Sequence, residues 1–357
     1  MINNKFVYLP SVFAVEDEYQ IIIKLKKPAL VKITVGNKTY FDHSNGVIRS
    51  SCPVHKISIP VCELDKHKKY TVCVTTLIKR LAYFSKCCDE EKETFDFYPV
   101  PDENIRICHL ADVHGDYKSC MNAVNKINGD IDLLVLNGDV IDHSGNVRNF
   151  NIIYKLCEAI TKGEKPVIFS RGNHDLRGIY AEKLEDYIPT LNRKTYFSFR
   201  LGSLWGLVLD TGEDKRDFHE EYGNTVCCEC FREDEEEFIK SVIEKEEYNK
   251  DGISHKVIIC HNPFTNCLEE PFNIERPRYR RWAKMLGESI NPEFILSGHL
   301  HISGVFDIGG KLDNEGVQPC PVILGSERTN KGGNTTFGLA YITLCKDGYN
   351  VDIIKNK

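Results

Sequence analysis

The sequence of 357 residues contains no apolar run long enough to cross a bilayer, which takes about 20 residues. Its N-terminal apolar stretch, residues 6–15, is interrupted by Pro10 and passes directly into Glu16, Asp17 and Glu18. No typical cleavage site follows this stretch, so the sequence argues against a signal peptide as well as a membrane anchor. We therefore expect a cytoplasmic protein that has no membrane partner.

Positive charge is also scarce, because 46 lysine and arginine residues stand against 52 acidic residues and leave a formal net charge of −6. Surfaces that bind nucleic acid are typically basic, so this balance argues against a nucleic-acid partner.

No disulfide pattern is evident, since the 15 cysteines are an odd number in a chain without an export signal. Paired C-x-x-C motifs are absent, so reduced thiols are the favoured interpretation. The run Cys227-Cys228-Glu229-Cys230 and the pair Cys87-Cys88 leave an additional thiolate metal site open as the alternative.

The composition, with 41% apolar and 27% charged residues, is that of an ordinary globular protein, and the length predicts two domains. Residues 1–99 contain alternating and β-branched runs separated by turn residues, which is typical of an all-β domain. In this region Leu64 precedes Tyr70 by six residues, and an alternating strand follows. This pattern resembles the tyrosine corner of fibronectin type III domains, where the tyrosine hydroxyl bonds to upstream backbone. Another small β-sandwich is the alternative.

The segment from Tyr98 to Asn104 contains Pro99 and Pro101 and predicts a linker, which gives domains of residues 1–99 and 100–357. Beyond it, strand-like runs alternate with amphipathic stretches such as residues 233–247 and 278–288. This alternation predicts an α/β fold.

Side chains that can bind metals follow five of the predicted strands. These are Asp112 and His114 after residues 105–110, Asp139 after 133–136, Asn173 and His174 after 167–170, His261 after 257–260, and His299 and His301 after 294–296. Ligands of α/β sheets bind at the carboxyl ends of the strands, so we expect these loops to converge. Gly138, Gly172 and Gly298 precede three of these residues, which fits turns whose backbone approaches a crowded site.

The donor set indicates the kind of metal. Carboxylate and imidazole groups without thiolate suit Mn, Fe, Zn or Ni. Two such ions about 3.5–4 Å apart need a bridging carboxylate, and they hold a water as hydroxide near neutral pH. Any one of these residues alone would more often be a capping or surface group, but together they predict a metal site.

The series D-x-H, G-D-x-x-D, G-N-H-D, H and G-H-x-H resembles the fingerprint of the calcineurin-like metallophosphoesterase superfamily, over residues 104–345. The resemblance implies two mixed β-sheets packed face to face and flanked by helices, with two divalent metal ions. One ion would be bound by Asp112, His114, Asp139 and His301, and the other by Asp139, Asn173, His261 and His299. His174 would be the catalytic histidine and Asp175 the acid that orients it.

Arg171, directly before Gly172, resembles the arginine with which protein Ser/Thr phosphatases grip phosphate, and a solvent-facing arginine is the alternative. A β-domain ahead of such a core resembles the order found in purple acid phosphatases. Those enzymes place a metal-bound tyrosine where this chain has Asp142, and they lack a histidine at the position of His114.

The predicted function is hydrolysis of phosphate monoesters or diesters by in-line attack of a metal-bridging hydroxide. The substrate would be a small phosphorylated molecule, and His174 would protonate its leaving group. A nuclease and a non-catalytic scaffold are the alternatives. The oligomeric state stays open, and the β-domain could form a wall of the site, bind a partner or stabilise the core.

Overall fold

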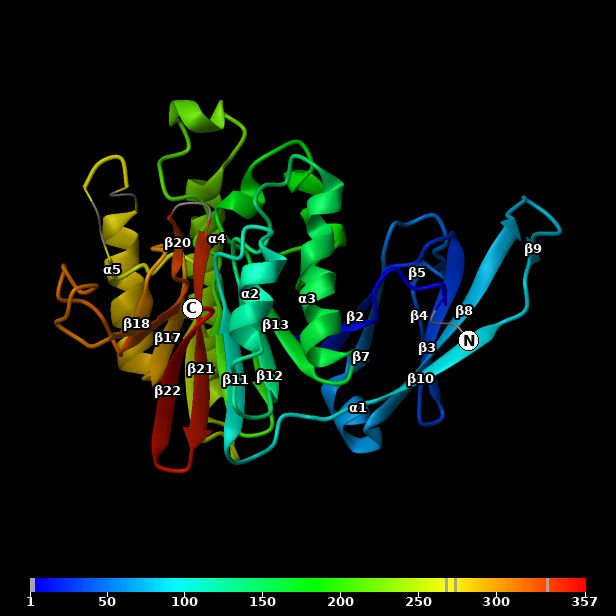
Figure 1. Ribbon diagram of the computed structural model, residues 1–357, viewed down its shortest axis with the longest axis horizontal. Coiled ribbons are helices and arrows are strands. Elements are labelled where there is room, and N and C mark those ends of the chain that lie inside the picture. The colour runs from blue at the N-terminus through cyan, green and yellow to red at the C-terminus, as the bar shows by residue number, and fades with distance from the viewer. Residues whose placement is uncertain (1–3, 267–268, 273–274, 332–333) are drawn as a thin grey trace.

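The computed structural model describes residues 4–266, 269–272, 275–331 and 334–357 and shows two large β-sheets between layers of helices, with a third sheet at one side (Figure 1). The α-helices are α1 (Val61–His67), α2 (Tyr117–Val124), α3 (Asn151–Thr161), α4 (Cys228–Lys245) and α5 (Arg276–Met285). A short π-helix, η7 (Leu286–Ile290), continues α5. Short 3-10 helices are η2 (Val147–Phe150), η3 (His174–Leu176), η4 (Ala181–Asp186), η5 (Glu220–Tyr222) and η6 (Glu247–Asn249).

The first large sheet has nine strands in the order β20-β21-β11-β12-β13-β1-β2-β7, with β22 beside β21. Their bounds are β1 (Ser11–Val15), β2 (Glu18–Ile23), β7 (His55–Pro60), β11 (Ile105–Leu110), β12 (Leu133–Asn137), β13 (Pro166–Ser170), β20 (Arg328–Lys331), β21 (Asn334–Cys345) and β22 (Gly348–Lys355). Strands β11, β12 and β13 are parallel, so their carboxyl ends lie at one edge of the sheet. Every residue of β12 and β13 is buried, as expected of parallel strands that are covered on both faces.

The second large sheet has the order β14-β15-β16-β17-β19-β18, and β15, β16, β17 and β19 are parallel. Its strands are β14 (Phe197–Leu201), β15 (Leu204–Val208), β16 (His255–Ile259), β17 (Phe294–Ser297), β18 (Ser303–Phe306) and β19 (Val322–Gly325).

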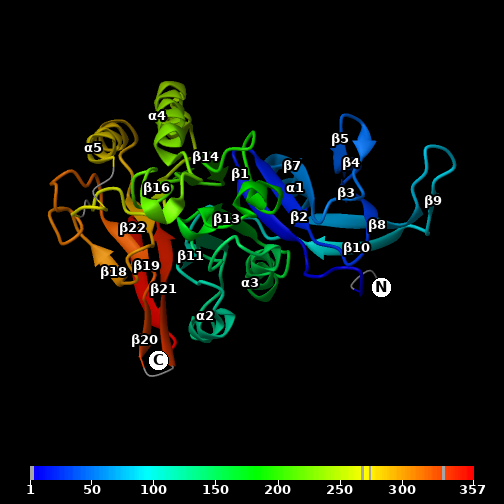
Figure 2. The same cartoon turned by 90° about the horizontal axis from the view of Figure 1, so that it is seen from above.

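The two large sheets pack face to face through one apolar core that includes Val135 and Ile168 of the first sheet and Ile259 and Leu296 of the second. Helices α2 and α3 cover the outer face of the first sheet, and α4 and α5 cover that of the second (Figure 2). The predicted α/β fold, two face-to-face sheets flanked by helices, is therefore confirmed.

A five-stranded sheet of order β10-β8-β3-β4, with β9 beside β8, packs on the β1-β2-β7 end of the first sheet. Its strands are β3 (Ala29–Val35), β4 (Lys38–Phe41), β8 (Lys69–Lys79), β9 (Lys86–Cys87) and β10 (Glu91–Asp96), and a small hairpin joins β5 (His43–Ser44) to β6 (Val47–Ile48). These layers form the expected small β-sandwich. One of them is continuous with the strands β11, β12 and β13, because β1 pairs in parallel with β13 through Val12–Pro166 and Phe13–Val167. The two predicted domains therefore share a sheet across the linker at residue 99.

The expected tyrosine corner is not formed as predicted. The hydroxyl of Tyr70, which is fully buried, donates to the carbonyl of Gly163 at 2.7 Å, in the turn before β13. A tyrosine corner would place that acceptor a few residues upstream of the tyrosine, where this chain instead forms helix α1. The bond therefore links the sandwich to the turn before β13.

Two further sequence predictions concern cysteines and membrane helices. The fourteen cysteines within the described ranges are free thiols, and Cys267 lies outside them. Among the helices of the described residues, none combines the length and the apolar character that a membrane span requires.

Candidate metal centre

The five predicted loops converge at the carboxyl ends of β11, β12, β13, β16 and β17. One group of side chains surrounds Asp112, whose Oδ1 lies 3.3 Å from Nε2 of His301 and 3.8 Å from Nε2 of His114. Asp112 is fully buried, whereas 42% of the His301 side chain is exposed, so this group opens to solvent at His301.

A second group surrounds Asp139. Its Oδ2 lies 3.2 Å from Nε2 of His261 and 3.3 Å from the side-chain amide of Asn173, and that amide lies 3.1 Å from Nδ1 of His299. The same Oδ2 lies 3.7 Å from Nε2 of His114, which belongs to the first group. The Asp139 carboxylate therefore faces both groups.

The backbone at these loops adopts conformations that permit such crowding. Positive φ angles of 45–69° occur at Asp112, His114, Asp139, His299 and His301. Left-handed backbone is uncommon for residues other than glycine and is often found at functional sites. The predicted role of the glycines is also confirmed. A Cβ at Gly138 would lie 2.3 Å from Nδ1 of His261, and one at Gly172 would lie 2.3 Å from Oδ1 of Asp139.

Unpartnered polar atoms test whether these residues fit a metal. Buried atoms without a hydrogen-bond partner include Oδ1 of Asp112, both ring nitrogens of His114 and Nε2 of His261. Leaving such atoms unsatisfied is costly, and a cation among them would remove that cost. The Asn173 side-chain amide lies beside two acceptors, Asp139 Oδ2 and His299 Nδ1, where its oxygen could bind a cation and its nitrogen could donate to both. The donors therefore fit divalent metal binding.

The charges within the centre lead to the same conclusion. Burial alone would raise the pKa of Asp112, but His261, His114 and His301 outweigh it and hold that pKa well below its usual range. At Asp139 burial is likewise outweighed by His261, so its pKa is lowered. Burial acts to lower the pKa of His261, yet Asp139 and Asp112 raise it to about 10. Two buried carboxylates thus stay ionised in a region that attracts cations.

His174 lies at the open side of the centre, as its predicted catalytic role requires. Its Nε2 is 4.0 Å from Oδ2 of Asp139, and 32% of its side chain is exposed. Its Nδ1 lies 2.9 Å from the carbonyl oxygen of Asp142, which fixes the orientation of the ring.

Asp175 does not orient His174 as predicted. Its carboxylate accepts from the backbone N–H of Gly172 at 2.7 Å, inside the loop that carries Asn173. Burial, followed by the charge of Asp139, raises the pKa of Asp175 to about 8. Asp175 thus supports the loop, and the orienting contact of His174 is the Asp142 carbonyl.

Arg171 is also placed differently from the prediction of a phosphate contact. Its Nε lies 2.6 Å from Oδ2 of the buried Asp210, and its guanidinium lies over the ring of Phe231. Only 16% of its side chain is exposed, so neither the phosphate-facing nor the solvent-facing alternative describes it.

One residue that the sequence did not assign positions a predicted ligand. The carbonyl oxygen of Asn137 lies 2.8 Å from Nδ1 of His261, which leaves Nε2 of that ring directed at the carboxylates. Such partners typically fix the orientation of metal ligands. Arg177, which pairs with Glu213 at 2.8 Å, lies 3.1 Å from the Asn173 amide but can donate to it only when the amide oxygen is turned toward the guanidinium. A sequence signal existed for Asn137, which directly follows the apolar run of a strand.

Two solved structures resemble the chain in fold. A purple acid phosphatase from yellow lupin (Lupinus luteus) seeds is 12% identical, with a TM-score of 0.60, and the match covers 98% of this chain and 72% of that one. PhoD is 11% identical, with a TM-score of 0.59, and the match covers 98% of this chain and 86% of that one. No curated protein matches the chain. The family model of the calcineurin-like phosphoesterases matches residues 105–303, the segment that holds every predicted metal ligand. The chain belongs to the calcineurin-like phosphoesterase family.

Proposed function

We propose that the chain hydrolyses phosphate monoesters or diesters at a centre of two divalent metal ions. The observation that carries this proposal is the position of Asp139 Oδ2, which lies 3.7 Å from His114 of one group and 3.2 Å from His261 of the other. A carboxylate in that position can bridge two ions, with Asp112, His114 and His301 on one side and Asn173, His261 and His299 on the other. When bound, such ions supply Lewis acidity and a hydroxide nucleophile near neutral pH.

His174 acts in this proposal at the leaving group. With Nδ1–H donating to the Asp142 carbonyl, the nitrogen that exchanges a proton with substrate is Nε2. The partial exposure of the ring allows a substrate oxygen to approach it. As an imidazolium, His174 would donate from Nε2 to the departing oxygen, which typically contributes about 10²–10⁴-fold to the rate.

A hollow of about 350 Å³ is lined by Asp142, the residue whose carbonyl contacts His174. Tyr8, Tyr117, Arg148 and Lys155 also line the hollow. Within the described residues neither cation is paired with a carboxylate, and Lys155 Nζ lies 3.7 Å from the centre of the Tyr117 ring. The hollow therefore suits a leaving group that carries a ring and a further negative charge.

The two alternative functions receive less support. Basic residues of α5, which could have bound a nucleic-acid backbone, are paired with glutamates: Arg276 with Glu315, Arg278 with Glu233 and Arg281 with Glu236. These ion pairs reduce the positive charge that α5 could offer to a nucleic-acid backbone. A non-catalytic scaffold would have no need for the complete and converging ligand set.

A substrate panel tests the proposal. The purified full-length chain would be loaded in turn with manganese, iron, zinc or nickel and assayed with nitrophenyl phosphate, bis-nitrophenyl phosphate and nucleotides. We expect hydrolysis of a monoester or a diester, with at least two equivalents of metal per chain by elemental analysis. Protein that holds two equivalents and hydrolyses no ester on the panel would contradict the proposal. Activity with only one equivalent would contradict the two-metal centre.

A further inference from the structure

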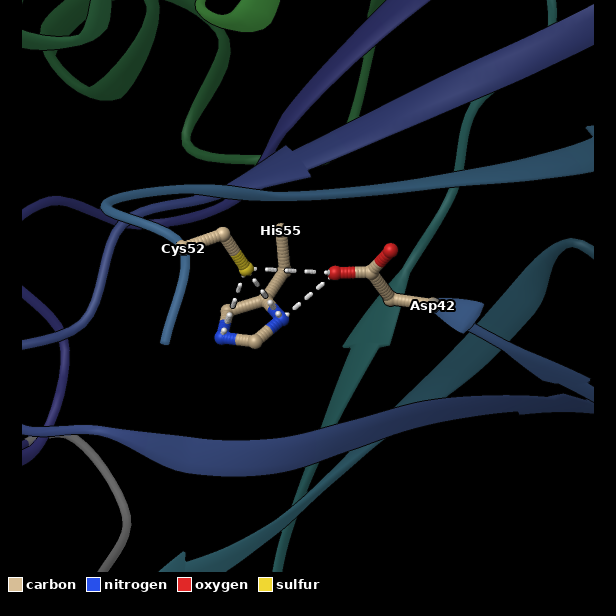
Figure 3. Close-up of side chains that lie close together, drawn as sticks. All are labelled: Asp42, Cys52 and His55. Carbon is tan, nitrogen blue, oxygen red and sulfur yellow. Dashed lines mark hydrogen bonds and ion pairs between the residues drawn. The ribbon is translucent and has the colours of Figure 1, made fainter. Parts of the chain in front are cut away.

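A second group of metal-binding side chains lies in the β-sandwich, away from the catalytic loops. Asp42 directly follows β4 of the five-stranded sheet, and His55 is the first residue of β7 in the nine-stranded sheet. Cys52 lies on the loop between them, and the three side chains point toward one another (Figure 3). We call these three residues the sandwich cluster.

The donor atoms of the sandwich cluster are close together. Nδ1 of His55 lies 2.7 Å from Oδ2 of Asp42. Sγ of Cys52 lies 3.6 Å from that oxygen and 3.6 Å from that nitrogen. Three different donor types therefore meet around one point.

A nucleophilic triad is not what this geometry describes. In a triad, the acid binds one ring nitrogen of the histidine and the nucleophile binds the other. Here both Asp42 and Cys52 lie nearest to Nδ1, and Nε2 is 3.9 Å from the sulfur.

The separations instead approach those of a tetrahedral zinc site. Bond lengths of about 2.0–2.3 Å to oxygen, nitrogen and sulfur put neighbouring ligand atoms about 3.3–3.6 Å apart. Both sulfur separations, at 3.6 Å, match this range. The Asp42–His55 contact would need to widen by about 0.6 Å, and the His55 ring would need to turn, because its Nε2 also lies 3.9 Å from the sulfur. A thiolate, an imidazole and a carboxylate together favour zinc over magnesium or calcium, which prefer oxygen ligands alone.

Burial and charge suit a cation at this position. His55 and Asp42 are 1% and 5% exposed, and the other carboxylate oxygen of Asp42 lies 3.4 Å from Nε of Arg49. Burial, followed by the charge of Asp42, raises the pKa of the Cys52 thiol to about 12. A bound cation would therefore take the place of the thiol proton, and a divalent ion would offset the thiolate and the carboxylate.

The cluster also has an open side. A hollow of about 850 Å³ is lined by Cys52, by Arg49 and Ser50 of the same loop, and by Leu77 and Arg80 at the end of β8. Water from this hollow can reach the cysteine and supply a fourth ligand. We propose that Asp42, Cys52 and His55 bind one zinc ion that links the two layers of the sandwich, in addition to the metals of the catalytic centre.

Cobalt absorption tests this site separately from the catalytic one. The predicted catalytic ligands include no cysteine, so a thiolate-to-cobalt charge-transfer band in the near ultraviolet that Cys52→Ser removes reports on the sandwich cluster. We expect the full-length protein to show this band, and we expect Cys52→Ser to lose it together with one equivalent of zinc. Cys62→Ser, at an exposed cysteine of α1, is the matched control and should keep both. Hydrolysis of nitrophenyl phosphate should be unchanged in both variants.

A second measurement requires no substitution. Alkylation of each cysteine in the natural chain would be followed by peptide mass spectrometry with and without zinc. Zinc at ten times its dissociation constant should slow the alkylation of Cys52 about tenfold, because only the free form reacts, and should leave Cys62 unaffected. Equal rates at Cys52 with and without zinc, or a zinc content that Cys52→Ser does not change, would overturn the proposal. The cluster would then be a hydrogen-bonded Asp42–His55 pair with a neighbouring thiol.

Discussion

Replacing Gly172 with alanine should damage the metal centre through a single added methyl group. The backbone at Gly172 has no positive φ, so alanine brings no conformational penalty there. Its Cβ, however, would lie 2.3 Å from Oδ1 and 2.4 Å from the backbone nitrogen of Asp139. Ordinary contact between such atoms needs about 3.5 Å, so Asp139 or its loop must move by roughly 1 Å.

The cost of this movement follows from what Asp139 contacts. Oδ1 accepts from the backbone N–H of His174 at 2.8 Å, and Oδ2 faces both ligand groups. The displacement would therefore shift the proposed bridging carboxylate and the proposed catalytic histidine together. A misplacement of about 1 Å typically costs about 10²-fold in rate, and overpacking costs about 1–3 kcal/mol of stability.

The assay compares hydrolysis of nitrophenyl phosphate, metal content and melting temperature in Gly172→Ala and in the natural chain. Gly287→Ala is the control, since its Cβ would lie 3.0 Å from Cβ of Pro319 and meets no metal ligand. We expect turnover about 100-fold lower, or loss of metal, in Gly172→Ala alone. Unchanged turnover and metal content in that variant would refute the close packing of Gly172 on Asp139.

Three further predictions concern single side chains. Asp139→Asn should lose at least one equivalent of metal, because its carboxylate faces both groups, and a metal content equal to that of the natural chain with full activity would contradict the bridge. His174→Ala should keep its metal and lose about 10²–10⁴-fold in turnover, with a smaller loss for nitrophenyl than for alkyl esters, and equal losses would count against proton donation. Burial lowers the pKa of Lys56 to about 8. Above that pH the folded chain therefore binds fewer protons at Lys56 than the unfolded chain does. The free energy of unfolding should then rise between about pH 8 and 10, by up to about 3 kcal/mol. Lys56→Met should lack this rise in urea unfolding, and parallel pH profiles for the two proteins would rule out the shift.

The strands that carry the predicted ligands could be predicted from the sequence, because the patterns that indicate them are local. The apolar run of residues 105–110 coincides with β11, and those at 133–136 and 167–170 lie within β12 and β13. Turn residues mark where each of these strands ends, and parallel strands place their following loops at one edge. The convergence of Asp112, Asp139 and Asn173 follows from these facts alone, whereas that of His261, which follows β16 of the other sheet, also requires the packing of the two sheets.

The hydrogen-bond partners inside the loops could not be predicted from the sequence, because they depend on contacts between residues that are distant in the chain. Nothing near His174 indicates that its ring binds the carbonyl of Asp142, or that Arg171 pairs with Asp210. The pairing of β1 with β13 was missed for the same reason, since residues 6–15 have the local character of any apolar segment.

The sandwich cluster could likewise be predicted only in part. In the sequence, the pattern that suggested a thiolate site was adjacent cysteines, as at Cys227 and Cys228. The structure instead brings Cys52 to His55, three residues later, and to Asp42 across the end of the sandwich. The spacing C-x-x-H was a usable signal for two of these residues, and the third required the fold.

The parallel pairing of β1 with β13 also constrains the order in which the chain can assemble on the ribosome. Val12 leaves the ribosome long before its partner Pro166, and 154 positions separate them. At roughly 5–20 residues per second, β1 would wait about 8–30 seconds with its outer edge unpaired. An unpaired strand edge is a template for other chains as well as for its own partner, so slow translation between these residues should favour aggregation. All strands of the sandwich have been translated by the end of β10 at Asp96, so the sandwich can fold first. Its strand β1 would then be in place for β13 to pair with when that strand is translated.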